Sequence, residues 1–211
     1  MSPLLAPDTT PDVATTVDAI LAEYVPAPIL AFLAERGTRI VVVRGPNAYH
    51  NASPALRRLG AGVDAWPFPP AGLFVVEEAT LYVKTISPMT IVHELGHAFD
   101  RALGGEDYLS TYDGAIRRAY AAETHYVTPY AASAVDEYFA EAFRAMCEAN
   151  DLRSLWPAAT RARLSKSLIA PIMTRLFARF DVADPDDICP LCRAHYGNEH
   201  DDDACRTEAV A

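Results

Sequence analysis

The sequence predicts an α+β domain with N-terminal helices, a small mixed sheet with an edge hairpin, and a mainly helical C-terminal part. Three observations lead to this class. Apolar residues recur at helical spacing near the N-terminus, short β-branched runs follow in the middle, and helical patterns return after residue 87. With 211 residues, of which 51% are hydrophobic, the chain can bury one sizeable core.

The N-terminal region predicts two helices behind an irregular segment. Residues 1–11 contain three prolines and no periodicity, so we expect a flexible arm there. Asp12 suits the N-cap of a helix whose apolar residues keep helical spacing. Pro26 and Pro28 end this helix and begin a second one, which Gly37 terminates.

The middle of the chain predicts the sheet. Residues 38–44 form a short β-branched run that ends at a Gly-Pro pair, which is typical of a buried strand. The segment 47–72 is rich in Pro, Gly and Ala and predicts mostly loop, with a short helix near 54–59. The runs 73–76 and 80–84 are separated by three residues and indicate a β-hairpin.

The C-terminal part predicts a series of helices. Ser87 and Pro88 are good cap and first-turn residues for a helix that runs to Gly104. Further helices are expected at 110–123, 133–150, 157–167 and 170–180. We therefore expect one domain over residues 12–182, followed at 183–211 by an acidic tail that carries cysteine and histidine.

Charge and hydropathy exclude several classes of protein. The formal net charge of −10 argues against nucleic acid and against an anionic membrane surface as partners. No apolar run approaches the roughly 18 residues needed to cross a bilayer. The first twenty residues contain no recognisable secretory signal, so we expect a cytoplasmic protein, with signal-independent export as the alternative.

One motif carries the chemistry. Residues 93–97 read His-Glu-Leu-Gly-His, an H-E-x-x-H pattern inside the helix that begins at Ser87. Four residues turn a helix by about 400°, so His93 and His97 share a face and both imidazoles can bind one ion. Glu94 would lie beside the open coordination position and take a proton from zinc-activated water. The plainer interpretation is two histidines in an amphipathic helix.

Two histidines do not complete a tetrahedral site, so a third ligand is needed. A longer motif with a third histidine would require Gly and His at positions occupied by Asp100 and Leu103, which excludes that class. Glu137 and Glu141 share one helical face at i and i+4. One carboxylate can therefore bind the metal while the other accepts an N–H from a ligand histidine.

Other residues compete for the third position less well. Glu123 and His125 flank the end of the preceding helix and are rival ligands. Asp136 lies beside Glu137 on the wrong side of its helix and is better explained as a charge at the helix start. The plainer interpretation of the whole 133–150 helix is a solvated acidic stripe.

Taken together, these segments match a known family. The run HELGHAFD, Tyr130 seven residues before Glu137, and the run EYFAEAF resemble the catalytic domain of anthrax lethal factor and the clostridial Pro-Pro endopeptidases. Those proteins are zinc metallopeptidases of the gluzincin type. The resemblance covers about residues 72–182 and implies a zincin-like metallopeptidase domain.

The resemblance assigns roles by position. It implies one zinc ion per chain with three ligands: His93, His97 and Glu137. It implies that Glu94 is the general base and that the Tyr130 hydroxyl donates to the oxyanion of the tetrahedral intermediate. Glu141 would support a ligand histidine from outside the coordination sphere.

These roles describe a zinc-dependent endopeptidase that hydrolyses peptide bonds. Its substrate is a protein or peptide, which we expect along the edge of the 73–84 hairpin; a purely structural hairpin is the alternative. Two further functions stay open. One is a regulatory intracellular protease with a single partner substrate, and the other is a non-catalytic zinc-containing interaction domain.

The C-terminal tail holds a second group of metal-binding residue types. They are Cys189, Cys192, His195, His200 and Cys205. A Cys-x-x-Cys pair commonly begins a structural zinc site, and Cys189 and Cys192 form such a pair. The spacing of the three later residues matches no zinc module, so a second zinc is not the favoured interpretation. Reduced thiols in a flexible tail and a disulfide are the alternatives.

Overall fold

The computed structural model describes residues 2–60, 62–151 and 154–180. The chain divides into two compact units, Met1–Met173 and Thr174–Ala211, and α10 (Ala170–Ala178) begins in the first and ends in the second. None of the helices in these described ranges has the length and apolar character needed to span a membrane.

The first unit follows the predicted order of helices, sheet and helices. Its helices are α1 (Pro11–Tyr24), α2 (Ala27–Glu35), α3 (Ala48–Ala52), α4 (Pro54–Leu59), α5 (Pro88–Gly104), α6 (Leu109–Tyr112), α7 (Gly114–Ala122), α8 (Val135–Met146) and α9 (Arg161–Leu164). Its strands are β1 (Arg39–Val42), β2 (Gly72–Val75) and β3 (Thr80–Val83). Short 3-10 turns occupy Val63–Ala65, Val76–Glu78 and Tyr130–Ala132.

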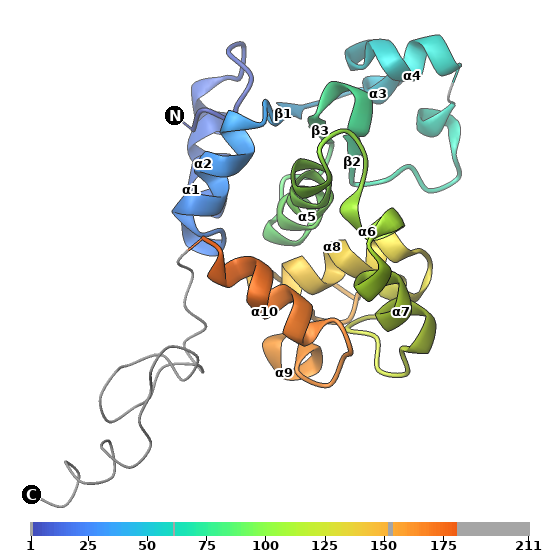
Figure 1. The fold of residues 1–211 in the computed structure, drawn as a ribbon. Helices are drawn as coiled ribbons and strands as arrows, with labels where there is room; N and C mark the ends of the chain where they lie inside the picture. The colour runs from blue at the N-terminus through green and yellow to red at the C-terminus, as the bar shows by residue number, and fades with distance from the viewer. Residues whose placement is uncertain (1, 61, 152–153, 181–211) are drawn as a thin grey trace, which may run out of the picture. The chain divides into compact units, whose positions relative to one another are not determined.

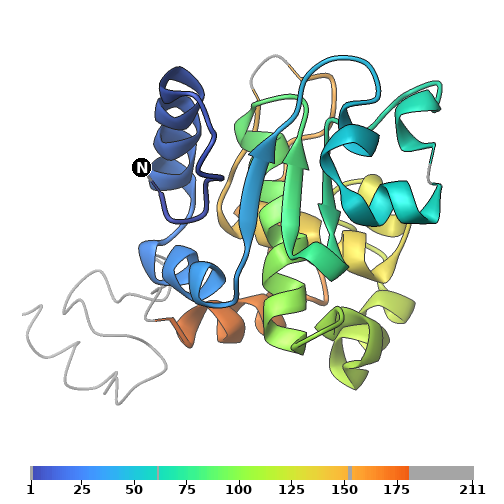
Figure 2. The ribbon, with the colours of Figure 1, turned by 90° about the horizontal axis from the view of Figure 1, so that it is seen from above.

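The three strands form a mixed sheet in the order β1-β3-β2 (Figure 2). β1 runs parallel to β3, with Ile40 opposite Leu81, and β2 runs antiparallel to β3, with Phe74 opposite Leu81. The predicted hairpin is therefore β2–β3, joined by the 3-10 turn Val76–Glu78. Because β3 lies in the centre, β2 is an edge strand.

The N-terminal segment differs from the expected flexible arm. Leu4 and Leu5 are buried, and Leu5 forms a parallel bridge with Ile40. The Ile40 N–H donates to the Leu4 carbonyl at 2.7 Å, and the Ala6 N–H donates to the Ile40 carbonyl at 3.0 Å. Two leucines that leave water hold this segment against β1. The first helix then begins at Pro11, one residue before the expected cap.

Several predicted helices are shorter than expected: the helix expected at 157–167 covers only Arg161–Leu164, and local capping divides the one expected at 110–123. The Asp113 carboxylate accepts the N–H groups of Ala115 and Ile116, so the expected helix 110–123 is interrupted and α7 starts anew. α8 stops at Met146, and Glu148 follows with φ +51°. The expected loop 47–72 contains α3 in addition to the predicted short helix.

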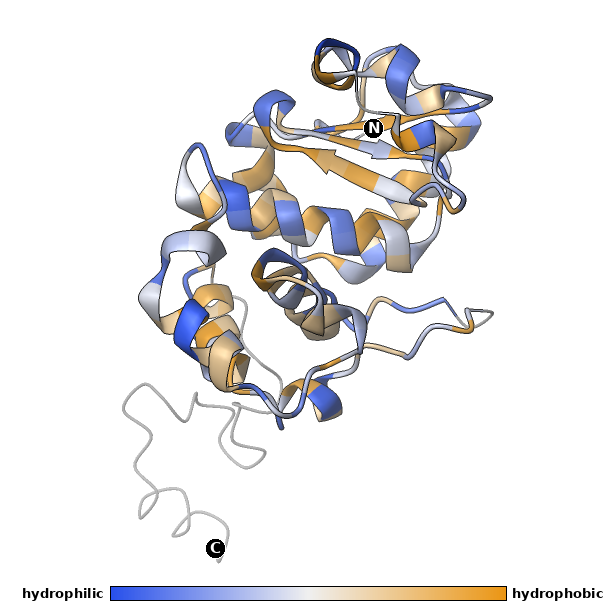
Figure 3. Ribbon diagram, turned by 90° about the vertical axis from the view of Figure 1, so that its right-hand side faces the viewer, coloured by the Kyte–Doolittle hydropathy of each residue, from blue (hydrophilic) through white to orange (hydrophobic). Residues whose placement is uncertain are grey.

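Apolar side chains cover both faces of the sheet. On one face a cluster joins α3, α4 and the strands: Val43, Ala48, Tyr49, Ala55, Leu56, Val63, Val75 and Tyr82. The other face rests on α5, which runs beneath the strands (Figure 3). The strands are largely hydrophobic in this view, whereas hydrophilic residues interrupt α5. α8 crosses on the far side of α5 from the sheet (Figure 1).

The helix α5 is the central element of the unit. Its N-terminus is capped as expected, because the Ser87 hydroxyl oxygen accepts the Thr90 N–H at 3.2 Å. Twelve of its residues are buried, and four of these are ionisable: His93, Glu94, His97 and Asp100. Burial of four such groups in a core helix is costly unless each has a partner, which indicates a functional centre.

The two helices α5 and α8 approach closely at one glycine. A Cβ atom on Gly96 would lie 2.8 Å from the Cα and 3.0 Å from the carbonyl oxygen of Ala140. Both contacted atoms belong to the backbone of α8, so neither can move without shifting the helix. Gly96 therefore sets the distance between the histidine helix and the glutamate helix.

We predict that Gly96→Ala lowers the free energy of unfolding by about 2 kcal/mol, because the added methyl group forces α5 and α8 apart. Urea unfolding followed by circular dichroism measures this change. Gly62→Ala is the matched control, since nothing lies within 4 Å of a Cβ there. Equal stability of the two variants would contradict the close contact.

Candidate metal centre

Two histidines and a glutamate converge between α5 and α8. His93 and His97 project from successive turns of α5, and Glu137 projects from the first turn of α8. Glu137 Oε2 lies 3.1 Å from His93 Nε2 and 3.4 Å from His97 Nε2. All three ligand atoms lie within 4.8 Å of one another, which makes them a candidate metal site.

The donor atoms fit a small tetrahedral dication. Ligand atoms at about 2.0–2.1 Å from such an ion lie roughly 3.3 Å from one another, which matches the separations of Glu137 Oε2 from the two imidazoles. That oxygen is buried and accepts no hydrogen bond from any described residue. An orphaned buried carboxylate oxygen that faces two imidazole nitrogens is the arrangement that a bound cation would satisfy.

The charges around the site also favour a cation. Burial lowers the pKa of His93, but the carboxylates of Glu137 and Glu141 outweigh it, so the net pKa lies above its ordinary value. Burial likewise opposes ionisation of Glu137, yet the two imidazoles hold the pKa of this carboxyl well below its usual range. The centre therefore stabilises positive charge, whether a proton or a metal ion supplies it.

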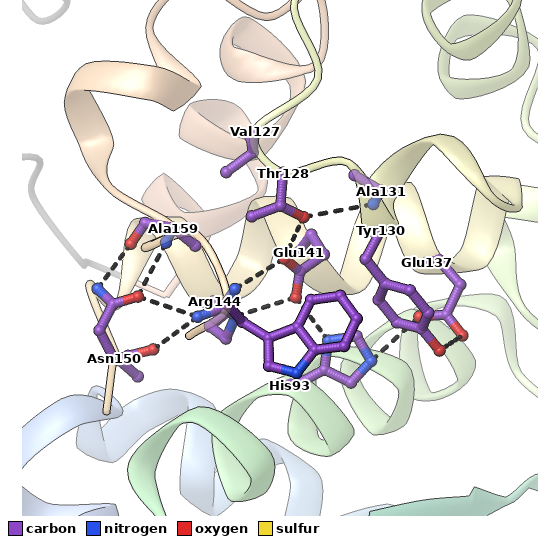
Figure 4. A network of polar contacts seen from close by, with 12 residues as sticks. His93, Val127, Thr128, Tyr130, Ala131, Glu137, Glu141, Arg144, Asn150 and Ala159 are labelled. Carbon is purple, nitrogen blue, oxygen red and sulfur yellow. Dashed lines mark hydrogen bonds and ion pairs between the residues drawn. The ribbon is translucent and has the colours of Figure 1, made fainter. Parts of the chain in front are cut away.

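Glu141 orients the first histidine. Its Oε1 accepts His93 Nδ1–H at 2.8 Å, which directs Nε2 toward Glu137 (Figure 4). The Thr128 hydroxyl donates to Glu141 Oε2 at 2.5 Å, and Arg144 donates to both carboxylate oxygens at 2.9 and 2.7 Å. This buried carboxylate is thus fully paired, and it sets the tautomer of His93.

Glu94 lies on the other side of the site, against the edge strand. A Cβ atom on Gly72 would lie 2.7 Å from Glu94 Cγ and 2.7 Å from Thr90 Cγ2. Only glycine allows β2 to pass this close to the carboxylate. Glu94 is buried, and burial raises its pKa although His93 and His97 act in the opposite direction. A carboxyl with a raised pKa is suited to exchange a proton.

Tyr130 borders the site from the 3-10 turn that precedes α8. Its hydroxyl donates to Glu137 Oε1 at 2.9 Å, and its ring centroid lies 5.6 Å from that of His93 (Figure 4). Burial and the Glu137 carboxylate raise the pKa of Tyr130, so the phenol stays protonated at neutral pH. With 43% of its surface exposed, Tyr130 faces both the site and solvent.

The rival ligands have other partners. The Glu123 carboxylate accepts hydrogen bonds from Tyr138, Ser167 and the Leu168 N–H, and His125 contacts the Thr124 hydroxyl. Neither residue, nor Asp136, belongs to the convergent group. The tail residues Cys189, Cys192, His195, His200 and Cys205 lie outside the described residues.

Several residues that build the site belong to no motif that the sequence shows. Thr128 precedes the helix and carries no motif, and Gly72 is visible only through its clash with Glu94. Arg144 left a weak signal, because it follows Glu141 at i+3, where a cation can pair with a carboxylate on one helix.

Comparison with solved structures gives an informative match. The chain is similar to the Pro-Pro endopeptidase PPEP-2 from Paenibacillus alvei, with a TM-score of 0.57 and 22% sequence identity. The similarity covers 82% of this chain and 97% of that chain. At this identity it shows a shared α+β fold. No family model matches the sequence, and no curated protein matches it.

We predict that Glu141→Gln weakens binding of Zn²⁺ by about 10–100-fold, because an amide cannot orient His93 as the carboxylate does. The variant also leaves the buried Arg144 without a counter-charge, which lowers the free energy of unfolding by about 3 kcal/mol. Competition with a chromophoric chelator and urea unfolding measure the two effects. Glu148→Gln, at an exposed position two residues beyond α8, should change neither.

Proposed function

We propose that this protein is a zinc-dependent endopeptidase. The observation that carries the proposal is the convergence of three ligand atoms from His93, His97 and Glu137, with a buried carboxylate and a phenol beside them. Three protein ligands leave the fourth tetrahedral position open, as in catalytic zinc sites, whereas structural zinc sites are closed by four. This favours catalysis over a non-catalytic interaction domain.

Two imidazoles and one carboxylate suit zinc better than they suit Mg²⁺ or Ca²⁺, which prefer all-oxygen sites. When bound, it would supply a Lewis acid that polarises a peptide carbonyl and acidifies a water molecule. The remaining steps belong to the side chains of this chain.

Glu94 is the proposed general base. It follows the ligand His93 directly, and its carboxylate lies between α5 and the edge strand, away from bulk water. From there it can accept a proton from the attacking water and return that proton to the leaving amine. The close passage of Gly72 limits the positions that this carboxylate can adopt.

Tyr130 is the proposed oxyanion donor. Its phenol keeps its proton at neutral pH and lies at the rim of the ligand cluster, where it donates to Glu137 Oε1. Transfer of this donated hydrogen bond from the carboxylate to a developing oxyanion would stabilise the tetrahedral intermediate. The carboxylate oxygen that it leaves remains near solvent.

The edge strand β2 is the proposed docking site for the peptide backbone. The Lys84 N–H donates to the Ala71 carbonyl at 2.8 Å, so alternation in the antiparallel ladder turns Leu73 toward β3 and turns the backbone groups of Gly72 and Phe74 outward. Those two residues flank Glu94. A peptide that pairs with β2 would therefore pass over the candidate metal centre.

The decisive experiment compares wild type with Glu94→Gln on a randomised peptide library, with cleavage products read by mass spectrometry and bound zinc by atomic absorption. We expect stoichiometric zinc in both proteins and cleavage by wild type only, since the amide cannot accept the proton. Glu106→Gln, at an exposed position, is the control and should cleave normally. Stoichiometric zinc without cleavage by wild type would refute the proposal and favour an interaction domain.

We predict that Tyr130→Phe retains zinc but loses about 10²-fold in kcat, the scale of one oxyanion donor. Steady-state kinetics on a peptide from the library measures this loss. Tyr112→Phe is the matched control, because Tyr112 is also exposed but donates to the Gly104 carbonyl. An unchanged kcat in Tyr130→Phe would remove this residue from the mechanism.

A further inference from the structure

Two large apolar side chains are exposed beside the candidate metal centre. Trp156 is 64% exposed, and its neighbour Leu155 is fully exposed. The indole centroid lies 6.3 Å from the Tyr130 ring at an interplanar angle of 61°, and the Tyr130 ring lies 5.6 Å from His93. Trp156 is thus separated from a proposed metal ligand by a single aromatic ring.

The chain around Trp156 is held at its base. The Asn150 side chain bonds to both backbone groups of Ala159. Its Oδ1 accepts the Ala159 N–H at 2.8 Å, and its Nδ2 donates to the Ala159 carbonyl at 2.9 Å. The backbone N–H of Trp156 also donates to the Ser154 hydroxyl oxygen at 3.0 Å. The two ends of the segment that carries Trp156 are therefore tied together by the Asn150 side chain.

The anchor of this segment is continuous with the metal centre. Arg144 Nη1 donates to Asn150 Oδ1 at 3.0 Å, while its other nitrogens hold Glu141, the partner of His93 (Figure 4). One buried guanidinium thus fixes both a metal-binding histidine and the base of the Trp156 segment.

We propose that Trp156 forms a substrate subsite that binds an apolar side chain next to the scissile bond. The inference rests on the proposed function. β2 borders the centre at Glu94, and Trp156 borders it beyond Tyr130. A peptide that pairs with β2 and continues across the centre would direct a side chain toward the indole.

The chemistry of the surface selects the occupant. The indole and the adjacent leucine offer a wide apolar area and no charge. They therefore bind an aliphatic or aromatic side chain most favourably, because both surfaces are removed from water on contact. Exposed tryptophans at binding surfaces commonly contribute a large share of the affinity. A polar or charged residue at this point of the peptide would gain little.

The test begins with the best-cleaved peptide from the randomised library. Each residue next to its scissile bond is replaced in turn by serine, and kcat and KM are measured for wild type, Trp156→Ala and Trp156→Phe. For the parent peptide we expect Trp156→Ala to lose about 30-fold in kcat/KM, mainly through KM, and Trp156→Phe to retain most of it. One of the serine peptides lacks the side chain that Trp156 binds. For that peptide, kcat/KM of wild type and of Trp156→Ala should differ by less than about 3-fold.

The same experiment separates the two proposals. If wild type cleaves no peptide, the proposed function fails and the subsite fails with it. Two results would overturn the subsite alone. In the first, wild type cleaves and Trp156→Ala has the same kcat/KM. In the second, Trp156→Ala retains zinc but loses kcat/KM equally on the parent peptide and on every serine peptide. Trp66→Ala is the matched control, because Trp66 is the only other tryptophan of the chain and is similarly exposed.

A binding readout that does not require turnover completes the test. In the double variant Trp66→Phe, Glu94→Gln, Trp156 is the sole tryptophan, and its fluorescence should shift to the blue when the parent peptide is added. In the double variant Trp156→Phe, Glu94→Gln, the emission of Trp66 should not change. A shift in the second protein but not in the first would overturn the subsite.

Discussion

The candidate centre depends on the close contact of α5 with α8. At Gly96 the two helices meet backbone to backbone, at a distance that no other residue would allow. This contact brings the glutamates of α8 within hydrogen-bond reach of the histidines of α5. A wider separation would break the contacts of Glu137 and Glu141 with the imidazoles of α5 and would leave the buried His93 without a carboxylate partner.

Charge balance within this contact explains the remaining polar residues. Glu141 is shared by one imidazole and one guanidinium, so its charge is fully compensated. Glu137 keeps an oxygen without a hydrogen bond from the described residues, and both imidazoles point toward it. The network therefore has a definite place for one more positive charge. A bound cation would complete it and would stabilise the folded chain by mass action.

The candidate metal centre is bordered by strand β2 and by Tyr130 with Trp156, and these two borders differ in chemical character. On the β2 side the glycine backbone and Glu94 leave little room, which suits an extended peptide main chain. On the Tyr130 side the exposed indole of Trp156 offers an apolar surface, which suits a side chain. Under the proposed function, main-chain pairing would involve the β2 border and side-chain selection the Tyr130 border, so variants could change the second without the first.

The sequence by itself determined the α+β class, the capped helix α5 and the convergence of His93 and His97, because these depend on helical periodicity and local caps. Spacing alone favoured Glu137 or Glu141 as third ligand over Glu123 and His125, since i and i+4 spacing places the first two on one face but does not rank them. The family resemblance implied Glu137 as the ligand and Glu141 as its support. Only the tertiary structure decided that Glu137 faces both Nε2 atoms while Glu141 holds Nδ1. The choice depends on how far α8 is rotated and shifted against α5, and contacts between segments distant in sequence, such as Gly96 with Ala140, set that geometry.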